Sequence, residues 1–302
     1  MWFTSLLHRR GARLHAPRLR PSIVPRLEIL EDRAVPSLGS LIAISVPDPL
    51  AACQHDQNWQ YPHGTPDTEV EPWLAVNPTN PSNIVAIWIA HDFCGNVASV
   101  TLDGGTTWQN VAIPGISQCT GGTAKNGADP WLAFAPNGVL YAESFSDGRT
   151  DISRSLDGGL TWSSPINVTV NATGEVDRGS VTADPGNSNL VYAVWNTGVF
   201  GGPATVQFTR TTDGGQAWEP NRAIYTAPVG NLVWNAKVEA LPNGTLVCLF
   251  TELVQTGAVK KVPQYNYALS VMRSSAKGQT WSAPTKALVL MARSDPNPQD
   301  QV

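Results

Sequence analysis

Charged and polar residues recur at one position of a repeated sequence unit. Aligning the units places four residues in one column, called here the entry column: Glu71, Asp129, Arg178 and Asn235. Beside this column stand Glu69, Asp177 and Trp234, and later in the units stand His91, Asp92, Asp147, Arg149 and Glu252. Two carboxylates at one pocket could serve glycoside hydrolysis, and an arginine could hold a carboxylated sugar. Alternatively, acids at the start of a strand only cap turns or face solvent.

The units are defined by a short phrase that is written four times. TLDGGTTW (101–108), SLDGGLTW (155–162) and TTDGGQAW (211–218) are close copies, whereas SSAKGQTW (274–281) has Ala276 in place of the aspartate. The aligned positions 103, 157, 213 and 276 lie 54, 56 and 63 residues apart. Self-similarity at such a period is typical of a repeat architecture.

Each unit predicts four short antiparallel strands. In the second unit, WLAFA, VLYAESF, DISRS and TWSSPINVTV are expected strands, separated by PNG, a polar loop and DGG. No window longer than about ten residues shows sustained helical periodicity. The sequence therefore predicts an all-β propeller of four-stranded blades.

The phrase itself is expected to be scaffold. Its glycines allow the positive φ of a tight turn, and its aspartate can accept hydrogen bonds from turn amides. Its tryptophan can bury about 150–250 Å². The residues concerned are Asp103, Trp108, Asp157, Trp162, Asp213, Trp218 and Trp281. One aspartate per loop supplies too few ligands for a metal, and we expect neither a metal nor another cofactor.

The pattern S/T-x-D-G-G-x-T-W resembles the Asp-box, or bacterial neuraminidase repeat, of the sialidase superfamily. DPWLAFAPNGVLY, SVTADPGNSNLVYAVW and LPNGTLVCLFTE also resemble secreted bacterial exo-α-sialidase-like proteins, over about residues 66–290. The resemblance implies a six-bladed propeller, which needs roughly 330 residues at this period. We therefore expect four blades of an incomplete six-bladed or larger propeller, with four-bladed closure as the alternative.

Sialidases also carry features that this sequence does not match. The resemblance implies three arginines around the sugar carboxylate, one of them in an Arg-Ile-Pro stretch, and a Tyr–Glu nucleophile pair. The sequence contains no Arg-Ile-Pro, and only Arg178 and Arg149 stand where a triad member could. Arg154, Arg210 and Arg273 each precede a phrase and are expected to be structural, as are Tyr141 and Tyr192 inside strands.

The N-terminal part differs in charge from the rest. Residues 1–37 hold seven of the 20 Lys+Arg and three acids, which leaves 13 basic and 21 acidic residues, a net charge of −8. Such an acidic domain is a poor nucleic-acid binder. RLEILEDRAVPS (26–37) resembles the LExLEDR-type leader of exported planctomycetal proteins, the alternative being a disordered basic tail. The expected organisation is a leader at 1–37, a linker or edge segment at 38–65 and the propeller at 66–302.

Four cysteines are compatible with export. Cys248 lies inside the strand LVCLF and is expected to be a buried thiol. Cys53, Cys94 and Cys119 lie in loop-like sequence, and Cys94–Cys119 is the expected disulfide because both flank the first phrase, which would leave Cys53 unpaired.

Two classes of function remain open. The first is an exported sialidase-like glycoside hydrolase, with little or no turnover by the chain as given. The second is a non-catalytic propeller that binds a glycan or a cell-surface protein. The candidate catalytic residues are Asp129, Asp177, Arg178 and Glu71, and the candidate ligand-binding residues are Arg149, His91, Glu252, Asn235 and Trp234. No segment is long enough to span a bilayer.

Overall fold

The computed structural model describes residues 41–53, 68–91, 93–169, 176–198, 203–259 and 262–290. The chain divides into two units, Met1–Ile42 and Ala43–Val302. Every element below lies in the second unit. The leader predicted at residues 1–37 lies outside the described residues.

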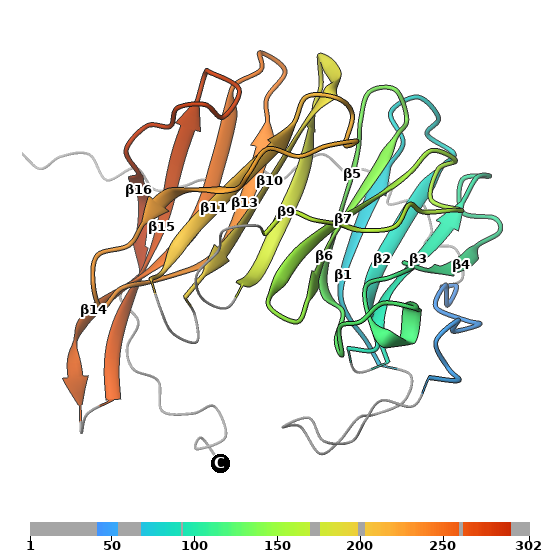
Figure 1. The fold of residues 1–302 in the computed structure, drawn as a ribbon, viewed down its shortest axis with the longest axis horizontal. Helices are drawn as coiled ribbons and strands as arrows, with labels where there is room; N and C mark the ends of the chain where they lie inside the picture. The colour runs from blue at the N-terminus through green and yellow to red at the C-terminus, as the bar shows by residue number, and fades with distance from the viewer. Residues whose placement is uncertain are drawn as a thin grey trace, which may run out of the picture. The chain divides into compact units, whose positions relative to one another are not determined.

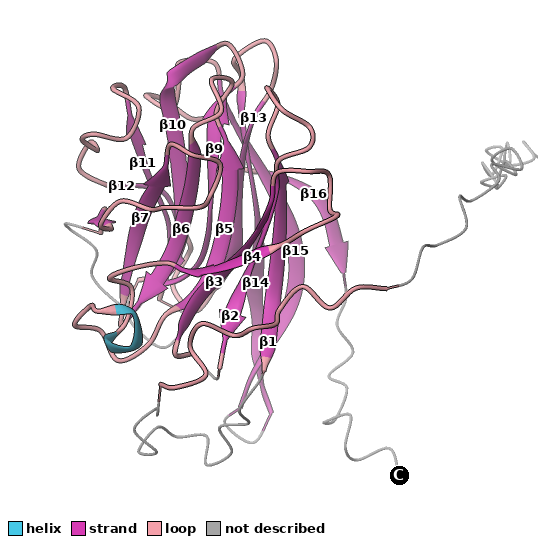
Figure 2. Cartoon of the chain, turned by 90° about the vertical axis from the view of Figure 1, so that its right-hand side faces the viewer, coloured by secondary structure: helices cyan, strands magenta, loops and turns pink. Residues whose placement is uncertain are grey.

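The predicted all-β fold is confirmed: the described part forms four sheets of four antiparallel strands each. Blade 1 contains β1 (Glu69–Val76), β2 (Ile84–Ala90), β3 (Gly95–Thr101) and β4 (Gln109–Ala112). Blade 2 contains β5 (Ala128–Phe134), β6 (Leu140–Ser146), β7 (Arg149–Ser155) and β8 (Ile166–Asn167). Blade 3 contains β9 (Val176–Asp184), β10 (Asn187–Thr197), β11 (Thr205–Thr211) and β12 (Arg222–Thr226). Blade 4 contains β13 (Leu232–Ala240), β14 (Leu246–Val259), β15 (Val262–Ser274) and β16 (Thr285–Leu290). Figure 2 shows these strands with η1 (Gln118–Thr120), a single 3₁₀ turn between blades 1 and 2.

The blades pack face to face in chain order (Figure 1), and their first strands β1, β5, β9 and β13 contact one another in that order. Alternation along the strands explains why. On β2, Val85 and Ile87 enter the core shared with Leu132 and Leu140 of blade 2, whereas Trp88 points to the opposite face. Equivalent cores join blade 2 to blade 3 and blade 3 to blade 4. Strand alternation therefore buries both faces of an inner blade.

The four repeated phrases form the turns between the third and fourth strands, as predicted, and are called box turns below. In the first, the Asp103 carboxylate accepts hydrogen bonds from the amide and hydroxyl of Thr107, at 2.9 and 2.6 Å. The Thr101 hydroxyl accepts from the amide of Gly105 at 2.9 Å. Box turn 2 repeats this arrangement, and box turn 3 repeats it without the hydroxyl bond to the aspartate, because Ala217 replaces the threonine. Box turn 4 keeps only the bond from the Gly278 amide to the Ser274 hydroxyl. The aspartate thus organises its own turn.

Each later box turn is also bonded to the preceding blade. Asn83 of blade 1 donates to Gly158 O at 3.0 Å. Tyr141 and Arg154 of blade 2 both donate to Gly214 O, at 2.9 and 3.0 Å, and Arg210 of blade 3 donates to Lys277 O at 2.7 Å. Tyr192 is buried inside its strand and donates to Asp184. Arg154, Arg210, Tyr141 and Tyr192 therefore have structural contacts.

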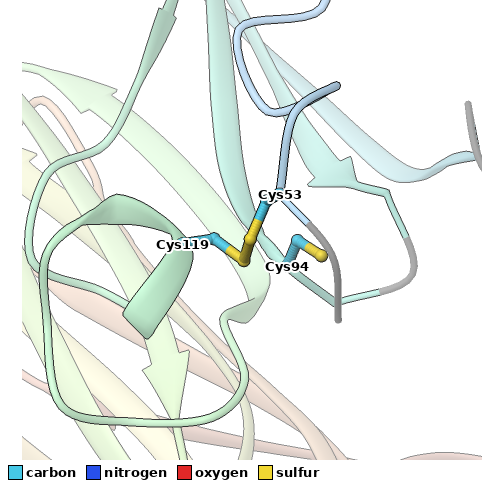
Figure 3. Close-up of side chains that lie close together, drawn as sticks. All are labelled: Cys53, Cys94 and Cys119. Carbon is cyan, nitrogen blue, oxygen red and sulfur yellow. A yellow bond between two sulfur atoms is a disulfide. The ribbon is translucent and has the colours of Figure 1, made fainter. Parts of the chain in front are cut away.

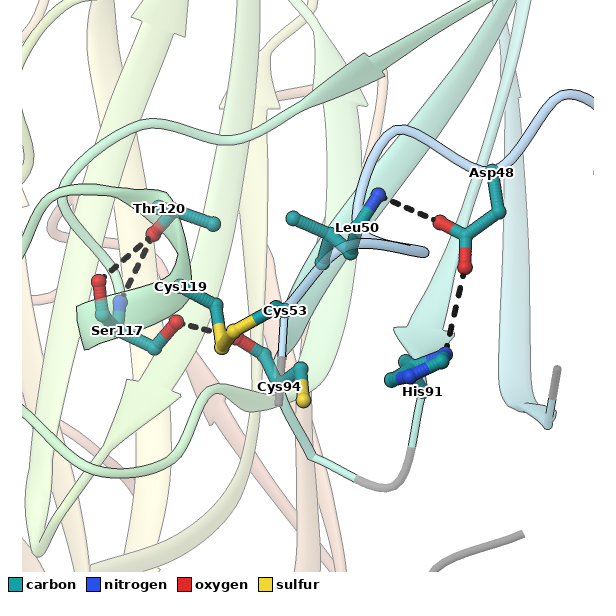
Figure 4. The surroundings of a disulfide bond; sticks show 8 residues. All are labelled: Asp48, Leu50, Cys53, His91, Cys94, Ser117, Cys119 and Thr120. Atoms are coloured by element: carbon teal, nitrogen blue, oxygen red, sulfur yellow. Dashed lines mark hydrogen bonds and ion pairs between the residues drawn. A yellow bond between two sulfur atoms is a disulfide. The ribbon is translucent and has the colours of Figure 1, made fainter. Parts of the chain in front are cut away.

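The outer face of blade 1 is covered by residues 43–53. Leu50 is buried in a cluster with Trp88, and Ile44 and Pro47 accept hydrogen bonds through their carbonyls from Ser99 and Asn110. Asp48 lies 3.5 Å from the ring of His91 (Figure 4). Residues 43–53 of the predicted linker thus pack on the blade.

This packing corrects the expected disulfide. The bond joins Cys53 to Cys119, with the two Cα atoms 5.7 Å apart, and not Cys94 to Cys119 (Figure 3). The pairing was wrong because residues 43–53 fold back along blade 1 and bring Cys53 to η1, which sequence spacing does not reveal. Cys94 is buried beside the bond, and the three sulfurs lie within 4.8 Å of one another. Cys248 is a buried thiol, as predicted.

Candidate functional site

The entry column has the same unusual backbone in every blade. Glu71, Asp129, Arg178 and Asn235 have φ values of 54°, 45°, 34° and 59°, in the left-handed region that residues other than glycine rarely adopt. Each lies at an irregularity in the pairing of the first strand with the second. Such bulges redirect a side chain, and strained non-glycine residues cluster at functional sites. In all four blades, therefore, a strained backbone conformation directs the side chain of the entry-column residue.

The four side chains meet at a single pocket, called here the axial pocket, with a volume of about 280 Å³. It lies at the starts of the first strands, and the box turns lie at the opposite ends of the blades, because the third strand runs parallel to the first. The lining residues are Glu71, Pro72, Trp73, Asp129, Pro130, Trp131, Arg178, Gly179, Asn235 and Lys237. The alignment of the repeats therefore located this pocket.

Arg178 joins two carboxylates at the centre of the pocket. Its guanidinium lies 2.5 Å from the Glu71 carboxylate, and its backbone amide donates to Asp129 at 3.3 Å. Asp177, the residue before Arg178, interacts with Asp129. Asn196 accepts from the backbone amide of Asn235 at 3.0 Å. These contacts connect blade 3 with blades 1 and 2 through Arg178, and with blade 4 through Asn196.

Burial makes these acids weak. It raises the pKa of Glu71, and a hydrogen bond to Asp129 raises it further, while Arg178 opposes both. Burial also raises the pKa of Asp129 and of Asp177. The Glu71–Asp129 bond raises the pKa of Glu71 and lowers that of Asp129. The pocket therefore holds neighbouring carboxyl groups whose pKa values are raised by burial.

The spacing of this pair limits its chemistry. Two hydrogen-bonded carboxyl groups are closer than the ~5–5.5 Å of retaining glycosidases or the ~6.5–9.5 Å of inverting ones. Glu71 and Asp129 as they stand leave no room for a sugar carbon or a water between them. They can bind hydroxyl or amino groups of a ligand and exchange a proton with it.

An aromatic stack forms the neighbouring wall. Trp73 and Trp131 stack with ring centroids 3.4 Å apart, and Trp73 donates from Nε1 to Leu132 O at 3.1 Å. The ammonium of Lys237 lies 3.9 Å from the centroid of Trp131. The same ammonium donates to the carbonyl of Gly179. Trp73 is 37% exposed, so part of its indole faces the pocket opening.

A buried acid stands behind this wall. Glu143 on β6 is opposite Trp131, and its side chain occupies the space that a side chain at position 179 would need. Burial raises the pKa of Glu143 to about 8, although the charge of Lys237 opposes the shift. Its Oε2 atom has no hydrogen-bond partner among the described residues. Burial also lowers the pKa of Lys237, whereas Glu143 raises it.

Sequence reasoning missed Trp73, Trp131, Lys237 and Glu143. A signal for the first three was available, since they stand two residues after an entry-column residue in blades 1, 2 and 4. Glu143 gave no such signal, because nothing in the strand LYAESFS predicts which side chain reaches the wall of the pocket.

Several predicted ligand-binding residues lie outside the lining of the pocket. Trp234 is 39% exposed on β13, and Glu69 is exposed on β1. His91 contacts Asp48, and Asp92 lies outside the described residues.

The remaining predicted residues have local partners. Asp147 accepts from the amides of Lys125 and Asn126, which ties down a loop. Arg149 pairs with Asp151 at 3.0 Å. Glu252 is buried and accepts from Tyr225 and Asn231. None of these three lines the axial pocket.

One cluster of the described residues has the spacing of metal ligands, namely Cys53, Cys94 and Cys119. Two of its sulfurs are joined to each other, and a disulfide sulfur is not a thiolate ligand. In the part of the chain that the structure describes, no helix is long and apolar enough to cross a membrane.

Comparison with known proteins gives the fold. No family model matches the chain, and no curated protein matches it. Among solved structures, a protein of unknown function from Dyadobacter fermentans DSM 18053 has a TM-score of 0.53 and 16% identity, over 72% of this chain and 68% of that one. An α-L-arabinanase of Penicillium chrysogenum, solved with arabinobiose, has a TM-score of 0.55 and 18% identity, over 72% and 66%. An α-L-arabinofuranosidase from Fusarium graminearum, solved with an iminosugar inhibitor, has a TM-score of 0.54 and 13% identity, over 72% and 66%.

These similarities establish a β-propeller like that of glycoside hydrolases. The matched region spans about two thirds of the length of the three chains. At identities of 13–18% the likeness concerns the fold, and function has to be argued from the site.

Proposed function

We propose that this protein is an exported propeller of the glycoside-hydrolase type whose axial pocket binds a glycan. The observation that carries the proposal is the juxtaposition of a half-exposed indole with a cluster of carboxyl groups. Trp73 offers a flat apolar surface for a sugar ring, and Glu71 and Asp129 offer hydrogen bonds to its hydroxyl groups. Sugar-binding pockets combine these two features, an apolar wall and a few convergent polar groups.

The sialidase resemblance of the box turns makes a sialoside the first ligand to test. Among the described residues, Arg178 is the arginine that lines the pocket, and Glu71 already holds its guanidinium. We therefore expect little or no sialoside turnover, because cleavage requires charge stabilisation that is fixed in place around the reacting sugar. In a fluorogenic sialoside assay, robust turnover that is lost in Arg178→Ala would contradict this expectation.

Binding is tested by the pair Trp73→Ala and Trp234→Ala. The two side chains are similarly exposed, 37% and 39%, and both lie on first strands, but only Trp73 lines the pocket. Removing Trp73 should weaken glycan binding by up to about tenfold, since stacking on an aromatic ring contributes about 0.5–1.5 kcal/mol. Trp234→Ala should leave the affinity unchanged. Calorimetric titration of both folded variants distinguishes a pocket from a general surface effect.

The second class, a propeller that binds a cell-surface protein, is weaker on this evidence. A pocket of about 280 Å³ is suited to a small group rather than to a flat protein surface. Equal loss of binding in both tryptophan variants would favour that class.

A further inference from the structure

We propose that the axial pocket selects a sugar that carries a free amino group, such as a glucosamine unit, over neutral and carboxylated sugars. This inference rests on the proposed function, since it names the chemistry of the glycan that the same pocket would take.

The charges around the pocket are the first reason. Four carboxyl groups lie at or behind its wall, those of Glu71, Asp129, Asp177 and Glu143. The described cations there are two, Arg178 and Lys237. The acidic groups therefore outnumber the basic groups, and full ionisation would leave a net charge of −2 at the pocket. A basic ligand would supply the missing positive charge.

Both cations are already engaged by the protein. The guanidinium of Arg178 is held by Glu71 at 2.5 Å, and the ammonium of Lys237 by Gly179 O and the face of Trp131. A carboxylated sugar would have to displace Glu71 from Arg178 and would add a fifth carboxylate to the group. Like charges in a partly buried site oppose each other strongly, which disfavours that ligand.

Glu143 is the second, independent reason. Its carboxyl group is 2% exposed, lies directly against Gly179 in the pocket wall, and leaves Oε2 without a hydrogen-bond partner among the described residues. A buried polar atom without a partner is costly. Because Glu143 lies behind the lining of the pocket, a cation in the pocket would act on its carboxyl group through charge rather than through a direct bond. An amino group with several N–H donors supplies hydrogen bonds and positive charge together.

The aromatic stack is the third reason. This stack already makes one cation–π contact, because the ammonium of Lys237 lies 3.9 Å from the centroid of Trp131. The other side of Trp131 is covered by Trp73, which is itself 37% exposed. The exposed part of Trp73 can therefore receive a second cation in the same manner. A 2-amino sugar combines a ring for stacking with such a cation.

Ligand entry should be coupled to the protons of the site. Burial raises the pKa of all four carboxyl groups, so protons partly neutralise the empty pocket. A cation beside them favours their ionised forms. Binding of an amino sugar should therefore release protons to the buffer, whereas binding of the neutral analogue should not.

The experiment compares two probes of one backbone: the β-1,4-linked glucosamine trisaccharide and its N-acetylated form. Calorimetric titration in two buffers of different ionisation enthalpy measures affinity and proton release. We expect the free amine to bind about tenfold tighter or more, the range of one desolvated cation–π contact. We also expect proton release with the amine alone. Trilysine serves as a cation without a sugar ring and should bind weakly.

Paired variants connect the preference to the pocket. Glu143→Gln keeps the size of the side chain but cannot ionise, and should reduce both the proton release and the preference for the amine. Glu252→Gln changes an equally buried acid of blade 4 outside the pocket and should leave both unchanged. Circular dichroism spectra identify variants that fail to fold, and wild-type protein alone decides the affinity comparison.

The outcomes separate the two proposals. Equal or tighter binding of the N-acetylated probe, or trilysine binding as tight as the amino sugar, would overturn the amino-sugar inference and leave the glycan pocket standing. Binding of neither sugar, with sialyllactose and arabinobiose also silent, would overturn the proposed function together with it.

Discussion

The two ends of the blades both contain backbone in the left-handed region, but they use different residue types there. Both ends place a left-handed residue in every repeat. Each box turn has two successive residues with positive φ, and seven of these eight residues are glycine, with Lys277 as the exception, whereas the entry column has Glu71, Asp129, Arg178 and Asn235. Glycine adopts this conformation at little steric cost, but other residues need support from their surroundings. Repetition of one residue type marks the scaffold, and variation at a strained position marks the pocket.

The pKa values of aspartates also differ between the two ends of the blades. The hydroxyl and amide of Thr107 lower the pKa of Asp103 to about 2, and the amide of Ala217 leads the groups that lower the pKa of Asp213. Burial raises the pKa of Asp129 and Asp177 at the other end. One side chain thus stabilises a turn when it is ionised and solvated. It becomes a proton-holding group when it is buried beside other acids.

The largest stability effect is expected at the pocket end of blade 1, where a disulfide secures the loops in addition to hydrogen bonds. Cys119→Ser should lower the free energy of unfolding by about 4 kcal/mol, because the lost bond closes a loop with a sequence separation of 66. Cys94→Ser, a change to a buried cysteine of the same cluster, should cost clearly less. Chemical denaturation under non-reducing conditions compares the two, and equal losses would argue against the Cys53–Cys119 pairing.

The next effect compares box turn 4, which packs on blade 3, with box turn 1, which has no preceding blade among the described residues. An added Cβ at Gly278 would lie 2.1 Å from the ring of Phe208, whereas at the equivalent Gly105 it would lie 3.7 Å from Trp108. Gly278→Ala should cost about 3 kcal/mol through overpacking and strain, and Gly105→Ala about 1 kcal/mol through strain alone. Similar thermal shifts for both variants would mean that box turn 4 does not pack on blade 3.

A smaller effect tests whether the box aspartate is only scaffold. Asp157→Ala removes the acceptor for the amide and hydroxyl of Thr161 and should cost about 1–3 kcal/mol. Blade 4 tolerates alanine at this position, as Ala276. Thermal melts should shift while glycan affinity holds. Loss of affinity in a fully folded Asp157→Ala protein would place the box turns within the function.

The last effect concerns the pH dependence of stability and tests the electrostatic side of the comparison. The folded-state pKa of Glu143, about 8, exceeds its ordinary value of 4.5, so the folded chain retains a proton that the unfolded chain loses in between. Stability should therefore fall as pH rises through this window. Glu143→Gln should lose less stability between pH 5 and pH 8 than the wild-type protein, so the melting temperatures of the two proteins should diverge as the pH rises. Parallel pH profiles of both proteins would show that Glu143 is ionised in the fold.

The sequence by itself determined the repeated architecture. Alternating strands, the four box phrases and the entry column all follow from local periodicity, because strand pairing within a blade connects neighbours in sequence. The alignment of repeats also brought Glu71, Asp129, Arg178 and Asn235 to one place, since equivalent positions of packed blades face one another.

Only the tertiary structure decided which side chains complete the pocket. Lys237 of blade 4 contacts Trp131 of blade 2, and Glu143 reaches the wall, because blade 3 has a glycine at position 179 between them. The Cys53–Cys119 pair depends in the same way on where residues 43–53 pack. Such contacts join residues far apart in the chain, and their geometry depends on side-chain volumes in several blades at once, which local patterns do not encode.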